Sequence, residues 1–371
     1  MVPFPASSRC SGRIVPRVAQ GVKAGDPVRF ALWYSQAMKL GTSLRFIYPT
    51  GPQTYERFKE ILAAMPPGGF IERPMGAFDT SEQARNVLEI AAAARAAGLN
   101  SLLFGDNHAI PSGYANCFAP VPTVARLMAV TGPMPIGMVL LAPFHQPIVL
   151  AEQIGTLAAF AEAPLIVVLA NGGRAQTFTA FGIEMKSRAR RLEELANVLR
   201  ALLAGERVTF HGRYLTLDGV SVSPRPRVPV EIWLAGTVPA AAERAGSLGD
   251  GWLTGQNTPD DELVRQLDAY RGAAARAGRP YRAVLRRDIF VAESDAAAHA
   301  EVDRILAEGY RGTGKDELLV GSPGTVIGRL RHYRALGFEE VMVRHITGDH
   351  GKMLDSFALI GRHVMPAIRS L

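Results

Sequence analysis

The amino-acid sequence predicts an α/β protein, a (β/α)8 TIM barrel with insertions, over residues 38–371. Short apolar runs alternate with longer amphipathic runs along this whole part of the chain. The apolar runs are almost continuous, which is typical of parallel strands buried on both faces. Eight such strands alternating with helices fit a closed barrel. A doubly wound open sheet is the alternative.

Each expected strand is a short apolar run. In chain order the strands are Leu40–Ile47, Ser101–Gly105, Pro135–Leu141, Leu165–Ala170, Val230–Ala235, Gly251–Thr254, Val284–Ala292 and Glu340–His345. The helices between them are rich in Ala, Leu, Glu and Arg. They include Ser81–Ala97, Pro147–Ala161, Arg188–Leu203, Pro239–Ser247, Asp260–Ala277, Ala296–Glu308 and Gly324–Leu336.

Three insertions interrupt the alternation, namely Tyr48–Thr80, Val208–Pro229 and Gly309–Gly321. The second alternates apolar and polar residues, which predicts a β-hairpin. Barrel enzymes place their chemistry on the loops that follow the strands. We therefore expect the insertions to act as lids over that face.

Composition describes a soluble globular enzyme: 371 residues, 48% hydrophobic and 20% charged. No apolar stretch approaches the ~20 residues that span a bilayer. Two isolated cysteines, Cys10 and Cys117, form no disulfide framework, so we expect a reducing, cytoplasmic location.

The formal charge of +7 resembles a nucleic-acid signature only at first sight. Five basic residues and one acidic residue precede Met38 and give +4, which leaves +3 for the rest of the chain. No basic stripe with interleaved aromatic residues follows, so we expect no nucleic-acid partner. Residues 1–37 have no helical or alternating period, and we expect a disordered N-terminal extension before a single domain, 38–371. An organellar transit peptide is the alternative.

Several catalytic motifs are absent or broken. GYRGTGKD at Gly309–Asp316 resembles a phosphate-binding loop, but Asp316 replaces the Ser or Thr that would bind magnesium, and the segment follows a helix. There is no Gly-x-Gly-x-x-Gly after a strand and no Gly-x-Ser-x-Gly elbow. His-x-x-x-His and Cys-x-x-Cys spacings are also missing, so we expect no metal site.

Two strands end in a way that suits a phosphate. LIVVLANGG (Leu165–Gly173) and PVEIWLAGT (Pro229–Thr237) stop at small residues just before a helix. Backbone N–H groups at such points face outward at the positive end of a helix dipole. Arg188 would add a bidentate donor. A cation in the first turn of a helix is unfavourable because it opposes the helix dipole, and a bound phosphate would explain its presence there. The alternative is that the arginines form a solvated helix face. Arg174 is a second candidate to bind the phosphate.

The segment FGDNH (Phe104–His108) lies at the carboxyl end of the second strand, where barrel enzymes carry catalytic residues. Asp106, Asn107 and His108 are therefore candidates to orient or protonate a bound group. The alternative is a loop whose polar side chains cap the next turn. His145, in PFHQP after the third strand, is a weaker candidate of the same kind.

Taken together, these pieces resemble the bacterial luciferase-like flavin monooxygenase family. The similarity covers nearly all of Met38–Leu371. Its most specific parts are HQPIVLAEQIGTL, FTAFGIEMKSRARRLEELANVLRALLAGERVTFHGRYLTL, PVEIWLAGT with AAERAGSLGDGW, and GSPGTVIGRLRHYRALGFEEVMVR.

The resemblance implies a luciferase-like (β/α)8 barrel with a flavin held at the carboxyl ends of its strands. The residues that match the family's phosphate site are Asn171, Gly172, Gly173, Arg188, Gly236 and Thr237. The flavin ring would lie against the third strand at Met138 and Val139, where a non-prolyl cis peptide is expected. The catalytic histidine loop would be Asp106–His108.

Two features depart from the family. The usual Ser-x-Gly-Arg turn into the fourth strand is replaced by FAEAPLIVV, and the luciferase double histidine is reduced to Asn107 and His108. A relative is expected, therefore, rather than a luciferase.

The activity that the resemblance implies is monooxygenation of a small organic substrate by reduced FMN and O₂ through a flavin C4a-(hydro)peroxide. Reduced FMN would come from a separate flavin reductase, because no nicotinamide-binding half is visible. We also expect a homo-oligomer and no membrane partner. The alternatives are a deazaflavin-dependent hydride-transfer oxidoreductase of the same fold and a non-catalytic flavin-binding protein.

Overall fold

The computed structural model describes residues 37–44, 79–109, 118–307 and 315–371. The expected N-terminal extension, nearly all of the first insertion and part of the third lie outside these ranges, as do residues 45–47 of the first expected strand.

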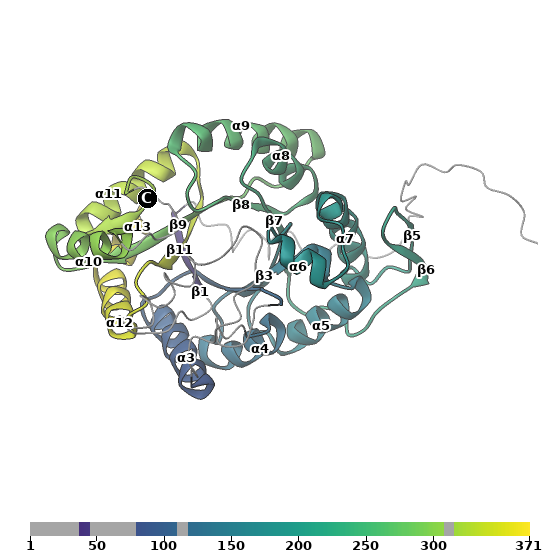
Figure 1. The fold of residues 1–371 in the computed structure, drawn as a ribbon, viewed down its shortest axis with the longest axis horizontal. Coiled ribbons are helices and arrows are strands. Elements are labelled where there is room, and N and C mark those ends of the chain that lie inside the picture. The colour runs from purple at the N-terminus through teal and green to yellow at the C-terminus, as the bar shows by residue number, and fades with distance from the viewer. Residues whose placement is uncertain (1–36, 45–78, 110–117, 308–314) are drawn as a thin grey trace, which may run out of the picture.

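Eight parallel strands within the described ranges form a closed barrel, as the sequence predicted. Figure 1 looks into this ring of strands, with the helices arranged around it. In the order of pairing around the ring the strands are β1 (Lys39–Leu44), β2 (Ser101–Gly105), β3 (Ile136–Leu141), β4 (Leu165–Ala170), β7 (Val230–Ala235), β8 (Gly251–Leu253), β9 (Ala283–Val291) and β11 (Glu340–His345). The pairing of β11 with β1 closes the barrel.

Three short strands of the described residues lie outside the ring. β5 (Val208–His211) and β6 (Thr216–Val220) pair antiparallel, which confirms the predicted hairpin. Figure 1 shows the hairpin projecting at the outer side of the helix ring. β10 (Leu319–Gly321) pairs parallel with the carboxyl end of β9. This last strand falls inside the third expected insertion, and the sequence did not predict it.

Helices connect the strands and cover the outside of the barrel. The longer ones are α3 (Thr80–Ala96), α4 (Pro120–Thr131), α5 (Pro147–Phe160), α7 (Arg188–Leu203), α8 (Pro239–Leu248), α9 (Asp260–Ala277), α10 (Asp295–Ala307), α11 (Pro323–Leu336) and α12 (His350–Leu359). Shorter elements are η1 (Ala142–Phe144), α6 (Ala175–Ala180), η2 (Met185–Ser187), the π-helical turn η3 (Ile360–Val364) and α13 (Met365–Ile368). The expected bounds of α7 and α9 match the observed ones.

Local sequence explains where individual helices begin. Asp79 accepts a hydrogen bond from the Ser81 N–H at 2.8 Å and so caps the start of α3. The Gln146 side chain accepts one from the Val149 N–H at 2.9 Å at the start of α5. Pro147 occupies the first position of α5, where its missing N–H costs no hydrogen bond.

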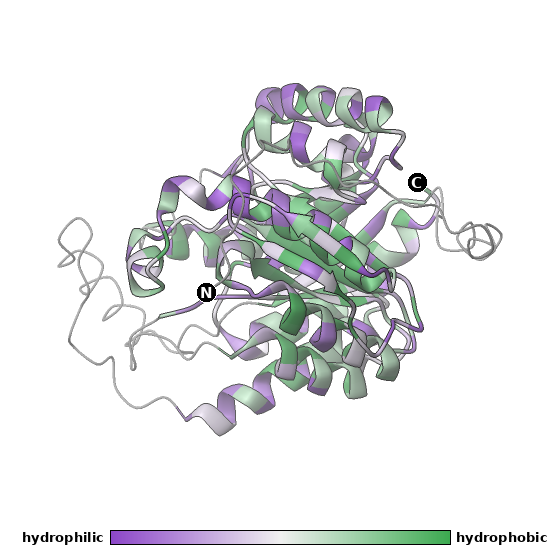
Figure 2. Cartoon of the chain, turned by 90° about the vertical axis from the view of Figure 1, so that its right-hand side faces the viewer, coloured by the Kyte–Doolittle hydropathy of each residue, from purple (hydrophilic) through white to green (hydrophobic). Residues whose placement is uncertain are grey.

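Alternate residues of each strand face the inside of the barrel. The middle of the interior is filled by large apolar side chains, namely Leu103, Ile166, Val168, Trp233, Leu253, Val284 and Met342. A Cβ atom at Gly137 would lie only 1.8 Å from the carbonyl oxygen of Ile166. Only glycine therefore allows β3 and β4 to approach this closely. In Figure 2 the strands are mostly green, whereas the helices around them carry both colours.

A buried charge network closes the amino-terminal end of the barrel. Glu340, only 1% exposed, accepts hydrogen bonds from the Ser101 hydroxyl at 2.5 Å and from Arg282 at 3.0 Å. Arg282 also donates to both carboxylate oxygens of Glu231 at 2.9 Å. Because the functional face of a barrel is the opposite one, this network contributes stability rather than chemistry.

A membrane crossing would need a longer and more apolar helix than any found in the described ranges.

His345, the last residue of β11, is fully enclosed beneath α12. Its ring lies 4.4 Å from that of Phe357, and its Nε2 atom has no hydrogen-bond partner. Burial lowers the pKa of His345 to about 3. The folded chain therefore keeps this imidazole neutral at pH values where the unfolded chain protonates it.

We expect His345 to make folding sensitive to acid. The free energy of unfolding is unaffected by the protonation of His345 at pH values above its ordinary pKa of about 6.5, and it decreases as the pH falls from there toward 3. His345→Leu should remove about 1.4 kcal/mol per pH unit from the pH dependence of the free energy of unfolding in this window. Urea unfolding at several pH values between 7 and 4 measures it.

The matched control is His211→Leu, because His211 lies exposed on the β5–β6 hairpin. The control should keep the wild-type slope. An unchanged slope in His345→Leu would show that the buried ring is not the source of the acid sensitivity.

Candidate active site

Asp106 directly follows β2 and ties it to β3. Its side chain is fully buried, and its Oδ2 atom accepts a hydrogen bond from the Leu141 N–H at 3.0 Å. Leu141 is the last residue of β3. One carboxylate therefore fixes the carboxyl ends of two neighbouring strands relative to each other.

Two imidazoles share the same carboxylate oxygen. The Nε2 atom of His145 lies 2.8 Å from Asp106 Oδ2, and that of His108 lies 3.1 Å away. Burial alone would raise the pKa of Asp106, but the hydrogen bonds from His108, His145 and Leu141 outweigh it and hold the pKa well below its usual range. An ionised carboxylate only accepts, so both rings donate through Nε2–H and keep Nδ1 as an acceptor.

Aromatic side chains wall the site on one side. The His108 ring makes edge contacts with Phe144 at 5.8 Å and Phe181 at 5.3 Å between centroids. Phe178 packs behind Phe144 at 4.8 Å. This wall lowers the local dielectric, which strengthens the hydrogen bonds to Asp106.

The structure thus brings two of the three predicted catalytic residues together. Asp106 and His108 are in contact, whereas Asn107 hydrogen-bonds to neither of them within the described part of the chain. His145, the weaker candidate, is in fact the nearer of the two imidazoles to Asp106. Its position after the third strand was the only signal in the sequence.

The predicted phosphate residues of β4 lie at its carboxyl end. Gly172 has a φ of +70°, which favours glycine, and a Cβ atom at Gly173 would meet nothing within 4 Å. The Oδ1 atom of Asn171 is buried without a hydrogen-bond partner. This turn is open above and carries an unsatisfied polar atom, which fits a ligand there.

Arg188 begins α7 and is the least engaged of its arginine cluster. It donates one long hydrogen bond, at 3.4 Å, to the Met185 carbonyl. Arg190 pairs with Glu194 at 3.0 Å, and Arg191 lies over the Tyr214 ring at 4.4 Å. Within the described ranges Arg188 has no carboxylate partner. The other candidate cation, Arg174, precedes α6 and is half-buried.

Gly236 and Thr237 follow β7, the strand beside β4. The Gly236 N–H donates to the Leu253 carbonyl at 3.0 Å, so it is not available to a phosphate. A Cβ atom at Gly236 would lie 2.4 Å from that of Ala241. Gly236 therefore shapes the turn, and Thr237, which is exposed, is the residue of this pair that has room for a ligand.

The expectation for the third strand needs a correction. The peptide bond between Met138 and Val139 is not cis; the cis bond within the described ranges is Ser223–Pro224. Met138 is fully buried in the core under the helices, whereas Val139 packs against the barrel interior. Because side chains alternate along a strand, only Val139 of this pair faces a ligand inside the barrel.

Small residues leave room at the barrel mouth. β2, β4 and β7 end with Gly105, Ala170 and Ala235, whose positions continue the inward-facing series of Leu103, Val168 and Trp233. All three are half-buried. These three strand ends therefore place no bulky side chain at their inward-facing positions.

Glu194 is a structural residue that sequence reasoning did not single out. Its buried carboxylate accepts the N–H groups of Arg213, Tyr214 and Leu215 at 2.8, 2.9 and 3.0 Å. Burial would raise the pKa of Glu194, but these bonds and that from Arg190 lower it. The carboxylate thus fastens the hairpin to α7 next to Arg188.

The sequence predicted no metal site. Within the described residues, however, Asp106, His108 and His145 offer ligand atoms that all lie within 4.8 Å of one another. Two imidazoles and a carboxylate are a donor set that zinc accepts.

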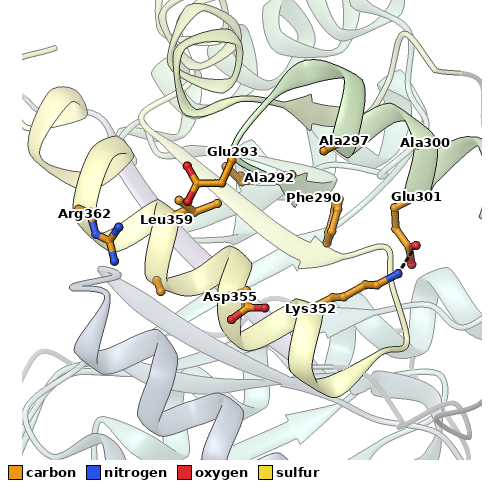
Figure 3. Close-up of a pocket in the computed structure, with 12 residues that line it drawn as sticks. Phe290, Ala292, Glu293, Ala297, Ala300, Glu301, Lys352, Asp355, Leu359 and Arg362 are labelled. Atoms are coloured by element: carbon orange, nitrogen blue, oxygen red, sulfur yellow. Dashed lines mark hydrogen bonds and ion pairs between the residues drawn. The ribbon is translucent and has the colours of Figure 1, made fainter.

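A separate hollow of about 630 Å³ lies between the end of β9, α10 and α12. Figure 3 shows Lys352 extending to Glu301, and the two side chains are 2.5 Å apart. Glu293, Asp355 and Arg362 also line it. None of the predicted site residues does, so this hollow is distinct from the candidate active site.

Comparison with protein families gives a match over residues 65–340 to the family described as luciferase-like monooxygenase. An F420-dependent glucose-6-phosphate dehydrogenase of Intrasporangium calvum is 27% identical over 61% of this chain and 77% of its own length. The enzyme of the same name from Nakamurella multipartita is 32% identical over 52% of this chain and 58% of its own length.

Among solved structures, the monooxygenase RslO1 from Streptomyces bottropensis has the same fold. It superimposes with a TM-score of 0.71 at 20% identity, over 89% of this chain and 99% of that one.

Glu194→Gln should detach the hairpin. The glutamine amide would place an NH₂ group where the backbone N–H groups of the hairpin need an acceptor. We therefore expect a loss of about 2 kcal/mol in the free energy of unfolding. Urea denaturation measures the loss, and limited proteolysis should cut the hairpin first.

Glu193→Gln is the matched control, because Glu193 pairs with Arg244 at 2.7 Å and accepts no hairpin N–H. Wild-type stability in Glu194→Gln would contradict the assigned role.

Proposed function

The chain belongs to the luciferase-like monooxygenase family, and we propose that it is an oxidoreductase that transfers hydride between a deazaflavin of the F420 type and a small alcohol or carbonyl compound. The observation that carries the proposal is the pairing of His108 with the buried Asp106. An imidazole held through Nε2 presents Nδ1 as a base to a substrate.

The residues at the mouth fit a phosphorylated tricyclic cofactor. Asn171 with its unpartnered oxygen, the open turn at Gly172 and Gly173, and Arg188 would hold the phosphate. The ring would lie over the small strand ends, with Val139 beside it. When bound, the deazaflavin supplies the hydride acceptor.

In this proposal His108 carries the proton. Oxidation of an alcohol removes a hydride from carbon and a proton from oxygen. A bound deazaflavin would accept the hydride, and Nδ1 of His108 would take the proton. The imidazolium that results lies 3.1 Å from the Asp106 carboxylate, which stabilises it. In the reverse direction the same nitrogen returns the proton to the carbonyl oxygen.

The sequence relatives support the deazaflavin. The relatives from Intrasporangium calvum and Nakamurella multipartita are both named as F420-dependent dehydrogenases. Their named substrate is not transferred to this chain, because the match covers about half to two thirds of it.

Monooxygenation with reduced FMN and O₂ is the second candidate. It is supported by the description of the matching family and by the aromatic wall around His108. Such a wall would shield one side of His108 from water, and chemistry with reactive oxygen needs a site from which water is kept away. A separate flavin reductase would then be the partner, and His108 would donate rather than accept a proton.

Two measurements separate the candidates. Titration of the purified chain with F420, FMN and reduced FMN gives the preferred cofactor. Anaerobic bleaching of F420 by a panel of alcohols supports hydride transfer, whereas substrate-dependent oxygen uptake with reduced FMN supports monooxygenation. Tight binding without either reaction would indicate a binding protein and overturn both.

Arg188→Ala tests the phosphate anchor. We expect it to weaken binding of the phosphorylated cofactor by about 1.5–3 kcal/mol, which is usual for a charge-assisted contact. Riboflavin, or the corresponding deazaflavin without phosphate, should bind nearly as before. Fluorescence titration measures both.

Arg190→Ala is the matched control, since Arg190 already pairs with Glu194 and Glu193. Equal losses for the phosphorylated and the phosphate-free ligands in Arg188→Ala would overturn the assignment.

His108→Ala tests the acid–base role. Turnover should fall by about 10²–10⁴, the range for a positioned acid–base group, while cofactor affinity stays unchanged. Rates are normalised to cofactor-bound protein, so that a loss of folded molecules is not counted. A variant that binds cofactor and keeps full turnover would remove His108 from the mechanism.

A further inference from the structure

We propose that Asp106, His108 and His145 also form a transition-metal site of the zinc type, which competes with the acid–base use of His108. The inference rests on the donor set and its geometry and does not depend on the identity of the cofactor. Nothing in the comparisons assigns a metal to these residues.

The distances already approach those of a metal site. Asp106 Oδ2 lies 2.8 Å from His145 Nε2 and 3.1 Å from His108 Nε2. Ligand atoms at 2.0–2.1 Å from a tetrahedral zinc ion lie about 3.3 Å apart. The two N···O distances are thus within about half an ångström of this value, and all three ligand atoms lie within 4.8 Å of one another, so a small rearrangement of the side chains would admit an ion among them.

A second observation is the other oxygen of the carboxylate. Asp106 is fully buried, its Oδ2 atom accepts all three donors, and its Oδ1 atom has no hydrogen-bond partner. Buried carboxylate oxygens are seldom left without a partner. The protein donors therefore leave this carboxylate incompletely satisfied, which favours the binding of a cation by it.

The surroundings favour a built site over a chance cluster. The Leu141 N–H donates to the carboxylate and orients it, as supporting hydrogen bonds do around metal ligands. His108 packs against Phe144 and Phe181, which also contact each other. Both histidines remain partly accessible, with 26% and 16% of their side chains exposed, so an ion has a path of entry.

Metal binding would replace the hydrogen bonds between the imidazoles and the carboxylate by bonds to the ion, without any redox step. Each imidazole binds the ion through the Nε2 lone pair and moves its proton to Nδ1, as the neutral ring permits. Three protein ligands leave a fourth position for water. Nδ1 of His108 then carries a proton and no longer acts as a base.

The experiment uses the full-length chain, without an affinity tag, stripped of metal with a chelator and free of cofactor. Calorimetry with Zn²⁺ should show one ion per chain. Co²⁺ should give the visible absorption of a tetrahedral site. His145→Gln should weaken Zn²⁺ binding at least about 30-fold, and Asp106→Asn should do the same.

Two surface pairs provide matched controls. His211 lies 3.1 Å from Asp218 and His350 lies 2.8 Å from Glu89, so each is a histidine–carboxylate pair without a second imidazole. His211→Gln and His350→Gln should leave the affinity unchanged. A thermal melt of His145→Gln confirms that the variant is folded.

Absence of one-to-one binding in the wild type would overturn the proposal, as would full affinity in a folded His145→Gln variant. Binding is measured without cofactor, so failure of the proposed redox function leaves this result intact. Where turnover is found, Zn²⁺ should inhibit it at the concentration that gives half-saturation in calorimetry.

Discussion

The carboxylate of Asp106 is the constraint on which the candidate site depends. A buried ionised group is unfavourable by several kcal/mol unless donors surround it. This one receives a backbone N–H from β3 and two imidazole N–H groups, at 2.8–3.1 Å. The position of each donor is therefore fixed by its hydrogen bond to the carboxylate as well as by its own packing. The ends of β2 and β3 and the orientation of both rings follow from a single oxygen atom.

Buried charged side chains are paired differently at the two ends of the barrel. At the amino-terminal end, Glu340, Arg282 and Glu231 satisfy one another and leave little room for a ligand. Near the other end Arg344 and Asp288 pair through two bonds of 2.9 Å. Among the described residues, buried side-chain atoms without a hydrogen-bond partner occur at several places in the fold, and Asn171 Oδ1 and Asp106 Oδ1 are the two at the candidate site. The Glu340–Arg282–Glu231 network and the candidate site therefore lie at opposite ends of the barrel, as stabilising and catalytic residues do in barrel enzymes generally.

The sequence predicted the barrel well because burial on both faces leaves a plain signal. The observed bounds of β2, β4, β7 and β11 are those expected from their apolar runs. Residue roles were harder. Met138 was grouped with Val139 because a cis peptide bond was expected between them. That bond is not cis, and because side chains alternate along a strand, Met138 faces the helices. Glu194 and His145 act through contacts with residues 19 or more positions away, and no local pattern encodes such contacts.

The anchor and the chemistry occupy different strands. Asn171 and Thr237 follow β4 and β7, and Arg188 begins the helix after β4, whereas Asp106 and His145 follow β2 and β3. Changes on one set of loops therefore leave the other set in place. In the proposed function, this separation would allow the same phosphate-binding residues to hold a flavin or a deazaflavin, while the residues after β2 and β3 would determine the chemistry at the ring. The reaction would then depend on the group that the two histidines contact at the barrel mouth, which is a hydroxyl proton, a reactive oxygen or a metal ion in the proposals above.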